Sequence, residues 1–299
     1  MTSRSTQSST AGWWAVIGAL VALLVAVKGY EAYQRHVARA DGAVPMLPQF
    51  REHDDRIFPQ SALLPWRMIG RVDFAGHLCS GTLVGPDLVL TAAHCLFKEG
   101  VLDSAAHFEV GANAIGYLDR VRVTEIAVAP DYDDIRFVET SEVDGEDWAF
   151  LRLARPVGAE HGWMDVAVLD PEDPASILRD NRLSLTGAGY TSDPDNRLSA
   201  HVDCAIHTWF NDETLFHRCD MGPGASGGPL FFRDGARWLI FALHSAQVDG
   251  EGRYPDLMAV DARALDPALR AALDGSLPFR PAMSHPPRTT LDAVASPAD

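Results

Sequence analysis

The sequence predicts an all-β fold, and the observation behind this prediction is the spacing of its apolar runs. Beyond residue 65, short apolar runs follow one another with Gly, Pro and Asp between them. Many short strands joined by tight turns are typical of β-sandwiches and β-barrels. The predicted strands are 68–74, 79–84, 88–93, 121–128, 148–153, 183–188, 200–208, 229–232, 238–244 and 257–260.

Two stretches depart from the strand pattern. The first is a short C-terminal helix that we expect over Ala264–Leu273. The second is Ala11–Val27, an uninterrupted run of apolar and glycine residues. As a helix the second stretch would span roughly 25 Å, slightly less than a hydrocarbon core of about 30 Å. It has no polar face, which argues against a core helix, and no A-x-A cleavage site follows it. We therefore expect residues 1–28 to be an uncleaved signal anchor in the membrane, with a cleaved signal peptide as the alternative.

The remaining chain divides by composition. Residues 29–50 are a predicted linker, residues 51–275 a folded domain, and residues 276–299 a Pro- and Ser-rich tail that we expect to be disordered. A chain of 299 residues with 47% hydrophobic residues is long enough for one or two globular domains with a sizeable core. Its net charge of −16 argues against nucleic acid as a partner, because nucleic acid favours clustered Lys and Arg.

The four cysteines fall into two pairs of similar spacing, Cys79 with Cys95 and Cys204 with Cys219. Neither pair has the C-x-x-C spacing of a zinc site. We expect two disulfides, each closing a loop of about 15 residues and contributing about 3 kcal/mol in the loop-entropy model. Paired disulfides indicate an oxidising compartment, whereas four free thiols would indicate a reducing cytosol.

The charges around the apolar stretch bear on its topology. Arg4 precedes it, whereas Lys28, Arg35 and Arg39 follow it, so the positive-inside rule would leave the carboxyl side in the cytoplasm. The cysteine pairs indicate the opposite. Following the cysteines, we expect a single-pass protein whose folded domain is extracytoplasmic (periplasmic), with secretion after signal cleavage as the alternative. A reporter fused after residue 45 that is active only in the cytoplasm would contradict this expectation.

One serine stands in an unusual run, Gly222–Leu230, which places glycines on both sides of Ser226. Glycine permits tight turns with positive φ and leaves room beside the backbone. A nucleophile that attacks a carbonyl needs access for its substrate and N–H donors for the oxyanion that forms. An ordinary Gly/Pro loop would have the same composition, so the interpretation depends on the upstream motifs.

Those motifs are Cys-x-Gly-Thr-Leu from Cys79, Leu-Thr-Ala-Ala-His-Cys around His94, Asp-Trp-Ala-Phe-Leu from Asp147, and Gly-Ala-Ser-Gly-Gly-Pro around Ser226. With them the chain resembles the chymotrypsin-like (trypsin-like) serine proteases, and most of all their bacterial V8-like, glutamyl endopeptidase-like branch. The resemblance covers about residues 50–275. It implies two six-stranded β-barrels with the active site in the cleft between them.

The resemblance also implies residue roles. Ser226 would be the nucleophile, His94 the base that takes its proton, and Asp147 the carboxylate that orients the imidazole. The backbone N–H groups of Gly224 and Ser226 would form the oxyanion hole. Taken singly, His94 could be a core histidine and Asp147 a turn carboxylate. Together in family order they predict a serine endopeptidase that works through an acyl-enzyme on protein or peptide substrates.

Specificity is expected from the strand that ends in His244 and Ser245, which resembles the wall of the S1 pocket. In glutamyl endopeptidases a histidine at the position of His244 binds the substrate carboxylate, which predicts cleavage after Glu or Asp. The rival is Asp220, which has the spacing of the trypsin S1 aspartate and would favour Arg or Lys. A third interpretation is that none of these residues sets specificity.

We expect no metal and no cofactor. Asp131, Asp133 and Asp134 offer oxygen ligands for calcium, but acidic loops of this kind are usually only solvated. The alternative function is a catalytically inactive, protease-like binding module. Such a module usually lacks a triad residue or a loop glycine, and this sequence lacks neither.

Overall fold

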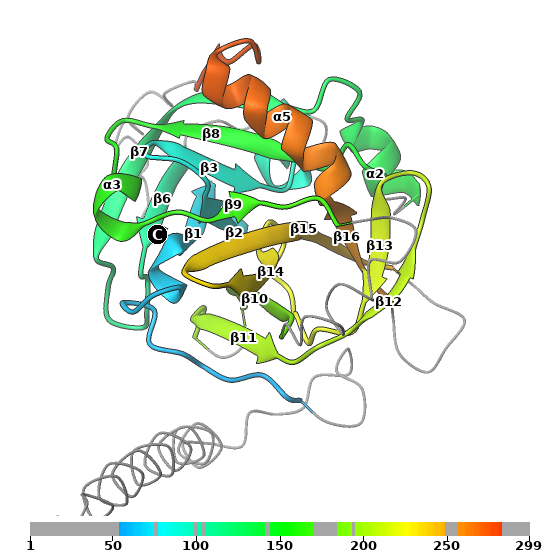
Figure 1. Ribbon diagram of the computed structural model, residues 1–299. Helices are drawn as coiled ribbons and strands as arrows, with labels where there is room; N and C mark the ends of the chain where they lie inside the picture. Colours follow the sequence, from blue (N-terminus) through cyan, green and yellow to red (C-terminus); the bar gives the residue numbers. More distant parts are fainter. Residues whose placement is uncertain are drawn as a thin grey trace, which may run out of the picture. The chain divides into compact units, whose positions relative to one another are not determined.

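The computed structural model describes residues 54–74, 77–98, 101–102, 106–140, 144–169, 184–192, 195–248 and 256–282. The predicted anchor, the linker and residues 283–299 lie outside these ranges. Within them, none of the helices combines the length and the apolar character that a membrane crossing requires. The described chain is mostly β and forms two large sheets and one short hairpin (Figure 1).

The first sheet closes into a six-stranded barrel. Its strands run in the order β7-β6-β1-β2-β3-β8, and β8 pairs again with β7. Phe108, Phe150 and Leu90 are fully buried inside it. The strands are β1 (Ile69–Phe74), β2 (His77–Leu83), β3 (Leu88–Thr91), β6 (Ala106–Val110), β7 (Asp119–Val128) and β8 (Ala149–Leu153).

The second sheet follows the order β11-β10-β14-β15-β16-β13-β12, with β9 beside β15. Among the described residues its two end strands do not pair. The structure therefore has one closed barrel and a second sheet, where two six-stranded barrels were expected. The strands are β9 (Asp165–Val166), β10 (Thr186–Tyr190), β11 (Leu198–Val202), β12 (Ile206–Trp209), β13 (Thr214–His217), β14 (Pro229–Asp234), β15 (Arg237–Val248) and β16 (Asp256–Asp261).

The strand predicted at 200–208 is two strands, β11 and β12. Asp203 between them has φ of +64°, a left-handed conformation that interrupts an extended strand. Two further strands of at least four residues, β6 and β13, were not predicted. Short elements complete the described part: β4 (Phe97–Lys98), β5 (Val101–Leu102), and the 3-10 turns η1 (Trp66–Met68) and η2 (His94–Leu96).

The predicted C-terminal helix is present as α5 (Ala262–Asp274). The Asp261 side chain caps its first turn by accepting from the N–H of Arg263, and Gly275 ends it with φ of +82°. Leu265 and Leu269 bury one face of the helix in the core. Two short helices, α2 (Asp134–Thr140) and α3 (Gly158–His161), lie in connections that the sequence did not mark as helical.

The start of the predicted disordered tail is instead part of the fold. Strand β17 (Arg280–Pro281) pairs with the edge of β7. Phe279 lies against the guanidinium of Arg152, 4.5 Å from the ring centre, and Ala282 donates to the carbonyl of Thr124. The Pro-rich composition concealed this strand, because its order comes from pairing with a distant edge.

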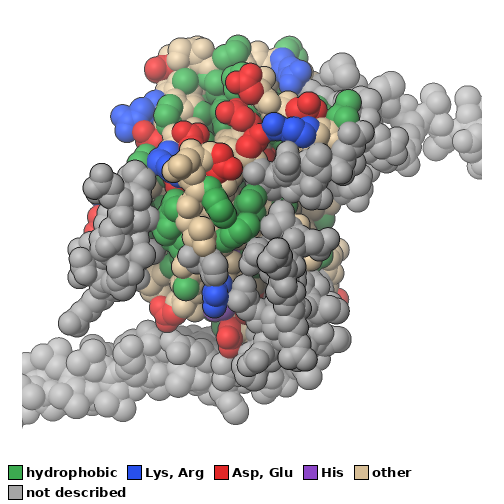
Figure 2. Space-filling model, turned by 90° about the vertical axis from the view of Figure 1, so that its right-hand side faces the viewer, with side chains coloured by type: hydrophobic (Ala, Val, Ile, Leu, Met, Phe, Trp, Pro, Cys, Tyr) green, Lys and Arg blue, Asp and Glu red, His purple; other side chains and the backbone are tan. Residues whose placement is uncertain are grey.

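The face drawn in Figure 2 mixes acidic and basic side chains in its upper part, above an apolar area. On the described part of this face the basic side chains form no continuous patch. The described part of this face therefore lacks the continuous positive charge that a phosphate backbone favours.

Candidate active site

His94 and Asp147 meet because two antiparallel strands hold the segments that carry them. In the β3–β8 pair, Thr91 lies opposite Ala149. His94 follows β3 and Asp147 precedes β8, so both emerge at the same end of the pair. The Nδ1 atom of His94 lies 2.8 Å from Oδ2 of Asp147.

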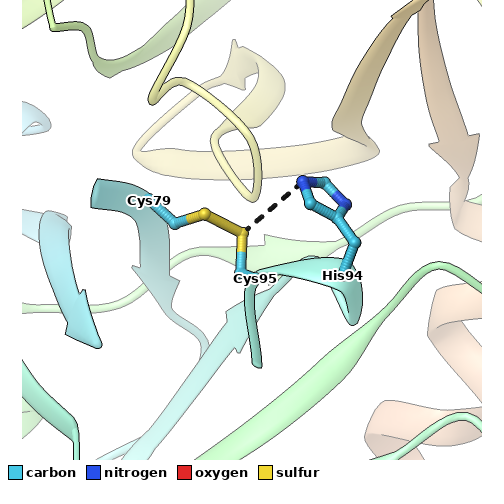
Figure 3. Close-up of side chains that lie close together, drawn as sticks. All are labelled: Cys79, His94 and Cys95. Atoms are coloured by element: carbon cyan, nitrogen blue, oxygen red, sulfur yellow. Dashed lines mark hydrogen bonds between the residues drawn. A yellow bond between two sulfur atoms is a disulfide. The ribbon is translucent and has the colours of Figure 1, made fainter. Parts of the chain in front are cut away.

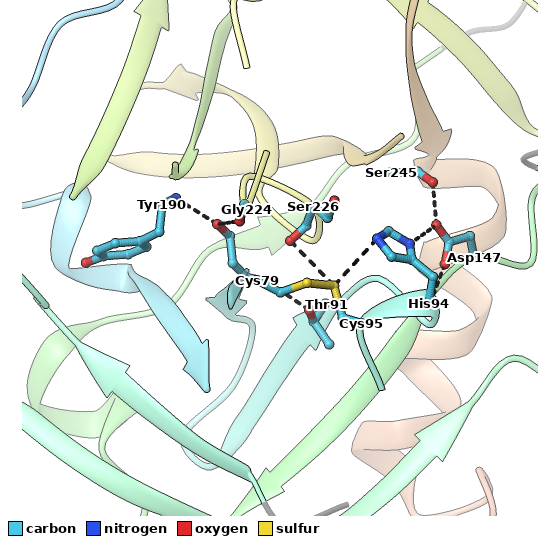
Figure 4. The surroundings of a disulfide bond; sticks show 10 residues. Cys79, Thr91, His94, Cys95, Asp147, Tyr190, Gly224, Ser226 and Ser245 are labelled. Carbon is cyan, nitrogen blue, oxygen red and sulfur yellow. Dashed lines mark hydrogen bonds and ion pairs between the residues drawn. A yellow bond between two sulfur atoms is a disulfide. The ribbon is translucent and has the colours of Figure 1, made fainter. Parts of the chain in front are cut away.

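The carboxylate of Asp147 is buried and receives three donors. Its Oδ1 accepts the backbone N–H of His94 at 2.9 Å. Its Oδ2 faces Nδ1 of His94 and accepts the Ser245 hydroxyl (Figure 4). Burial alone would raise the pKa of Asp147, but the charge and hydrogen bonds of His94 and the bond from Ser245 lower it below its ordinary value. The group is therefore an anion at neutral pH.

The pKa of the His94 imidazole is shifted in the opposite direction, upward. Burial disfavours its charged form, yet the charge and hydrogen bond of Asp147, together with the charge of Asp134, raise its pKa above the ordinary 6.5. An imidazole held in this way accepts a proton more readily than a free one.

A disulfide lies beside this imidazole. Cys79 and Cys95 are bonded, with their Cα atoms 6.2 Å apart, and Sγ of Cys95 is 3.8 Å from Nε2 of His94 (Figure 3). The same sulfur lies 3.8 Å from the carbonyl oxygen of Ser226. Nε2 of His94 and that carbonyl oxygen therefore lie no farther apart than the sum of these two distances, and Figure 4 draws Ser226 on the Nε2 side of the ring.

The loop that carries Ser226 is folded by its own backbone and by one buried serine. Ala225 donates to Gly222, and Gly228 donates to Ala225. Gly227 has φ of +81°, and a Cβ there would lie 2.2 Å from the carbonyl oxygen of Ser80. Only glycine fits so close to another backbone.

Ser80, on β2 of the first barrel, was not identified from the sequence. Its N–H donates to the carbonyl of Ser226 at 2.8 Å, and its hydroxyl donates to the carbonyl of Gly224 at 3.0 Å. The same hydroxyl accepts the N–H of Tyr190 at 2.7 Å. Ser80 therefore fastens the serine loop to both sheets, and no local motif distinguishes it from other strand serines.

Two backbone N–H groups of this loop, two residues apart in the chain, have no acceptor among the described residues. Within the described residues, the N–H groups of Ala225, Gly227 and Gly228 have backbone acceptors, whereas those of Gly224 and Ser226 have none. Both residues are partly exposed, and Gly224 has φ of +95°. A pair of free, neighbouring N–H groups can receive a negatively charged oxygen.

Comparison with known proteins identifies the family of this chain. A family model described as a trypsin-like peptidase domain matches residues 79–238. The chain belongs to the trypsin-like peptidase family. The match includes all four motifs on which the predicted resemblance rests, and that resemblance is confirmed.

One relative and one solved structure are similar to this chain. A trypsin-like protease from Streptomyces glaucescens is 35% identical over 198 residues, which are 58% of this chain and 67% of the relative. The solved structure of a Glu endopeptidase in complex with MPD matches with a TM-score of 0.56 and 17% identity, covering 73% of this chain and 97% of that chain. At that identity the second likeness establishes the chymotrypsin-like fold alone.

The three residues expected in the S1 region, His244, Ser245 and Asp220, each have different hydrogen-bond partners. His244 is buried on β15, and its Nδ1 lies 3.0 Å from Nε2 of His217 on β13. Nδ1 of His217 in turn accepts the N–H of Cys219 at 3.2 Å. His217 was not identified from the sequence, because nothing local to β13 indicates that its ring meets a histidine on another strand.

Ser245 and Asp220 are both engaged elsewhere. Ser245 donates to Asp147, so its hydroxyl belongs to the carboxylate's surroundings. The carboxylate of Asp220 accepts the N–H of Asp55 at 2.9 Å and lies 3.2 Å from Nδ1 of His201. Asp220 also follows Cys219, whose disulfide with Cys204 is present with a Cα separation of 4.9 Å.

Three groups of side chains in the described ranges have the proximity of metal ligands, and each has another explanation. The group at His94 contains Cys79 and Cys95, whose sulfurs are bonded to each other. In the second group Asp220 already accepts the N–H of Asp55 and lies beside His201, and in the third Asp119 already pairs with Arg155 and His161. We therefore assign no metal to these groups. The first group is Cys79, His94 and Cys95, the second is Asp55, His201 and Asp220, and the third is Asp119, Glu160 and His161.

Proposed function

We propose that this peptidase is a serine endopeptidase with Ser226 as nucleophile, His94 as general base and Asp147 as the orienting carboxylate. The observation that supports the proposal is the hydrogen bond between the buried Asp147 and the partly buried His94, beside the glycine-flanked loop of Ser226. Asp147 holds the proton on Nδ1 of His94, which leaves Nε2 unprotonated and able to accept a proton.

In the first step the Ser226 hydroxyl oxygen bonds to the substrate carbonyl carbon, and its proton passes to Nε2 of His94. The carbonyl π electrons move onto the oxygen. The N–H groups of Gly224 and Ser226 then donate hydrogen bonds to the oxyanion. Such preorganised donors stabilise the transition state because they point to the place where charge develops.

In the second step the tetrahedral intermediate collapses and the C–N bond breaks. His94 returns its proton to the leaving amine, and the acyl group stays on Ser226. Water then repeats the sequence, with His94 taking its proton, and hydrolysis releases the acid and restores the hydroxyl.

A serine-reactive phosphonate tests this proposal directly. We expect it to label the folded protein at Ser226, because labelling requires an activated hydroxyl beside a functional base. Mass spectrometry of the modified peptide identifies the site, and Ser226→Ala is the control that should stay unlabelled. A folded wild-type protein that takes no label would instead support the inactive binding module.

We further propose that His244 recognises an acidic P1 side chain. Burial, with a further contribution from His94, lowers the pKa of His244 to about 3, and burial together with His244 and His201 lowers the pKa of His217 well below its ordinary value. Both rings are therefore neutral at pH 7, and each carries a single N–H.

The hydrogen bonds determine where these protons lie. Nδ1 of His217 accepts the N–H of Cys219, so the proton of His217 is on Nε2 and is donated to Nδ1 of His244. The proton of His244 is then on its Nε2, which has no acceptor among the described residues. A fixed, neutral N–H donor in a dry site suits a substrate carboxylate. Asp220, already bonded to Asp55, is the weaker candidate for P1 recognition.

A peptide library that varies P1 checks this assignment. We expect preferential cleavage after Glu or Asp, and we expect His244→Leu to lower kcat/KM for a P1 Glu substrate by about 10- to 100-fold. A hydrogen bond to a charged group is lost, so a P1 Leu substrate should be affected much less.

The control for this experiment is Asp220→Asn, which preserves shape and should leave the P1 ranking unchanged. Preferential cleavage after Leu or Phe by the wild type would contradict both charged-pocket assignments. Cleavage after Arg or Lys that disappears in Asp220→Asn would transfer the role to Asp220.

A further inference from the structure

The face of the His94 imidazole is covered by an aromatic ring from α2. The rings of His94 and Phe137 are stacked, with centroids 4.8 Å apart and planes inclined by only 7°. We propose that Phe137 is a positioning residue that stabilises the imidazolium form of His94 through the face of its ring. This inference rests on the proposed function, because it concerns the charge that His94 gains during catalysis.

Phe137 is held in place by the start of its helix. The Asp133 side chain caps α2 by accepting the N–H groups of Ile135 and Arg136 at 3.0 and 3.2 Å. The carbonyl of Asp133 accepts the N–H of Phe137 itself at 3.0 Å. The Asp133 side chain therefore has a structural partner, and it fixes the turn that presents Phe137.

Neighbouring aromatic rings fix the side chain. The ring of Tyr132 lies 6.4 Å from that of Phe137 and 5.4 Å from that of Phe97. The Tyr132 hydroxyl donates to Oδ1 of the buried Asp134 at 3.3 Å. Phe137 is thus the end of a packed aromatic row, and it is partly buried rather than freely rotating.

The titratable groups around His94 come from three directions. Asp147 contacts its Nδ1, Asp134 on α2 adds a second negative charge nearby, and neutral His244 on β15 lies on the side of the second sheet. The two carboxylates favour the imidazolium, whereas burial opposes it. Phe137 adds an attraction of another kind, because the face of an aromatic ring carries partial negative charge and attracts a cation within about 6 Å of its centre.

The timing of this attraction gives it a catalytic consequence. The imidazole is neutral before Ser226 attacks and becomes an imidazolium as Nε2 receives the hydroxyl proton. A contact that is stronger with the imidazolium than with the imidazole lowers the barrier instead of only tightening binding. The flat stack also limits rotation of the His94 ring, which keeps Nε2 directed toward Ser226.

The test compares Phe137→Leu, which keeps an apolar side chain without a π face, with Phe137→Tyr, which keeps the π face. The measurements are kcat and KM across pH, with substrates that differ at P2. For the wild type, activity should fall as pH drops through the pKa of His94, which lies above 6.5.

We expect Phe137→Leu to lower kcat about two- to five-fold and to move the acidic limb down by about half a pH unit, whatever the P2 residue. Phe137→Tyr should have the kcat and the acidic limb of the wild type. If the Leu variant is unstable, Phe137→Met offers the same comparison.

An unchanged kcat and limb in Phe137→Leu would overturn the inference. So would an effect confined to KM that varies with P2, because Phe137 would then be only a wall of the substrate site. Neither outcome touches the proposed function, which fails separately if wild-type protein takes no phosphonate.

Discussion

The Ser226→Ala variant is expected to lose about 10⁶-fold in kcat. Without the hydroxyl no acyl-enzyme can form. What remains is direct attack by water on the bound substrate, assisted by the N–H groups of Gly224 and Ser226. Those donors and substrate binding account for a residual rate about 10³- to 10⁴-fold above water. Steady-state hydrolysis of a peptide substrate measures the loss.

The fold should survive this change. Ser226 is partly exposed, and no hydrogen bond of its hydroxyl is present among the described residues. Its carbonyl bond from the N–H of Ser80 does not depend on the side chain. The thermal unfolding of Ser226→Ala should therefore match that of the wild type. The control is Ser276→Ala, which changes an exposed serine near the end of α5 and should leave kcat unchanged. A Ser226→Ala protein that retains more than a small fraction of the activity would refute the proposed nucleophile.

The Asp147→Asn variant is expected to lose about 10⁴-fold in kcat. Both carboxylate oxygens accept: Oδ1 from the N–H of His94, and Oδ2 from Nδ1 of His94 and from Ser245. An amide has only one acceptor oxygen. The backbone N–H of His94 can only donate, so that oxygen takes the Oδ1 position and the NH₂ group faces Nδ1 of His94. His94 relieves the conflict by moving its proton to Nε2, and that nitrogen can then no longer take the proton of Ser226.

This prediction is checked by kcat at saturating substrate, where loss of the correct tautomer appears without loss of binding. The matched control is Asp266→Asn, since the carboxylate of Asp266 pairs only with Arg270 on the exposed side of α5 among the described contacts. A loss of less than ten-fold in Asp147→Asn would mean that another group orients His94.

The comparison of sequence and structure separates two kinds of residue. His94, Asp147 and Ser226 were identifiable because each lies in a short motif that resembles a motif of the trypsin-like proteases, and because the motifs follow in the order of that family. Ser80, His217 and Phe137 were not, because a serine or histidine on a strand and a phenylalanine on a short helix are ordinary locally. Their significance comes from contacts with segments far away in the chain.

The same distinction applies to the fold. Gly and Pro spacing predicted most strands, because turn chemistry is local, and the helix predicted at 264–273 is present as α5. The spacing did not predict that β17 pairs with β7, or that Asp203 divides one apolar run into two strands.

The sequence by itself determined the family, the β-rich architecture and the three residues of the proposed triad. These depend on the backbone freedom of glycine, on cysteine spacing and on short motifs, which act over a few residues. Only the tertiary structure decided which side chains serve the triad: Ser245 on Asp147, Phe137 on His94, Ser80 under Ser226, and His217 behind His244. Hydrogen bonds and ring contacts act over only a few ångströms, and the register of paired strands decides which residues come within that range.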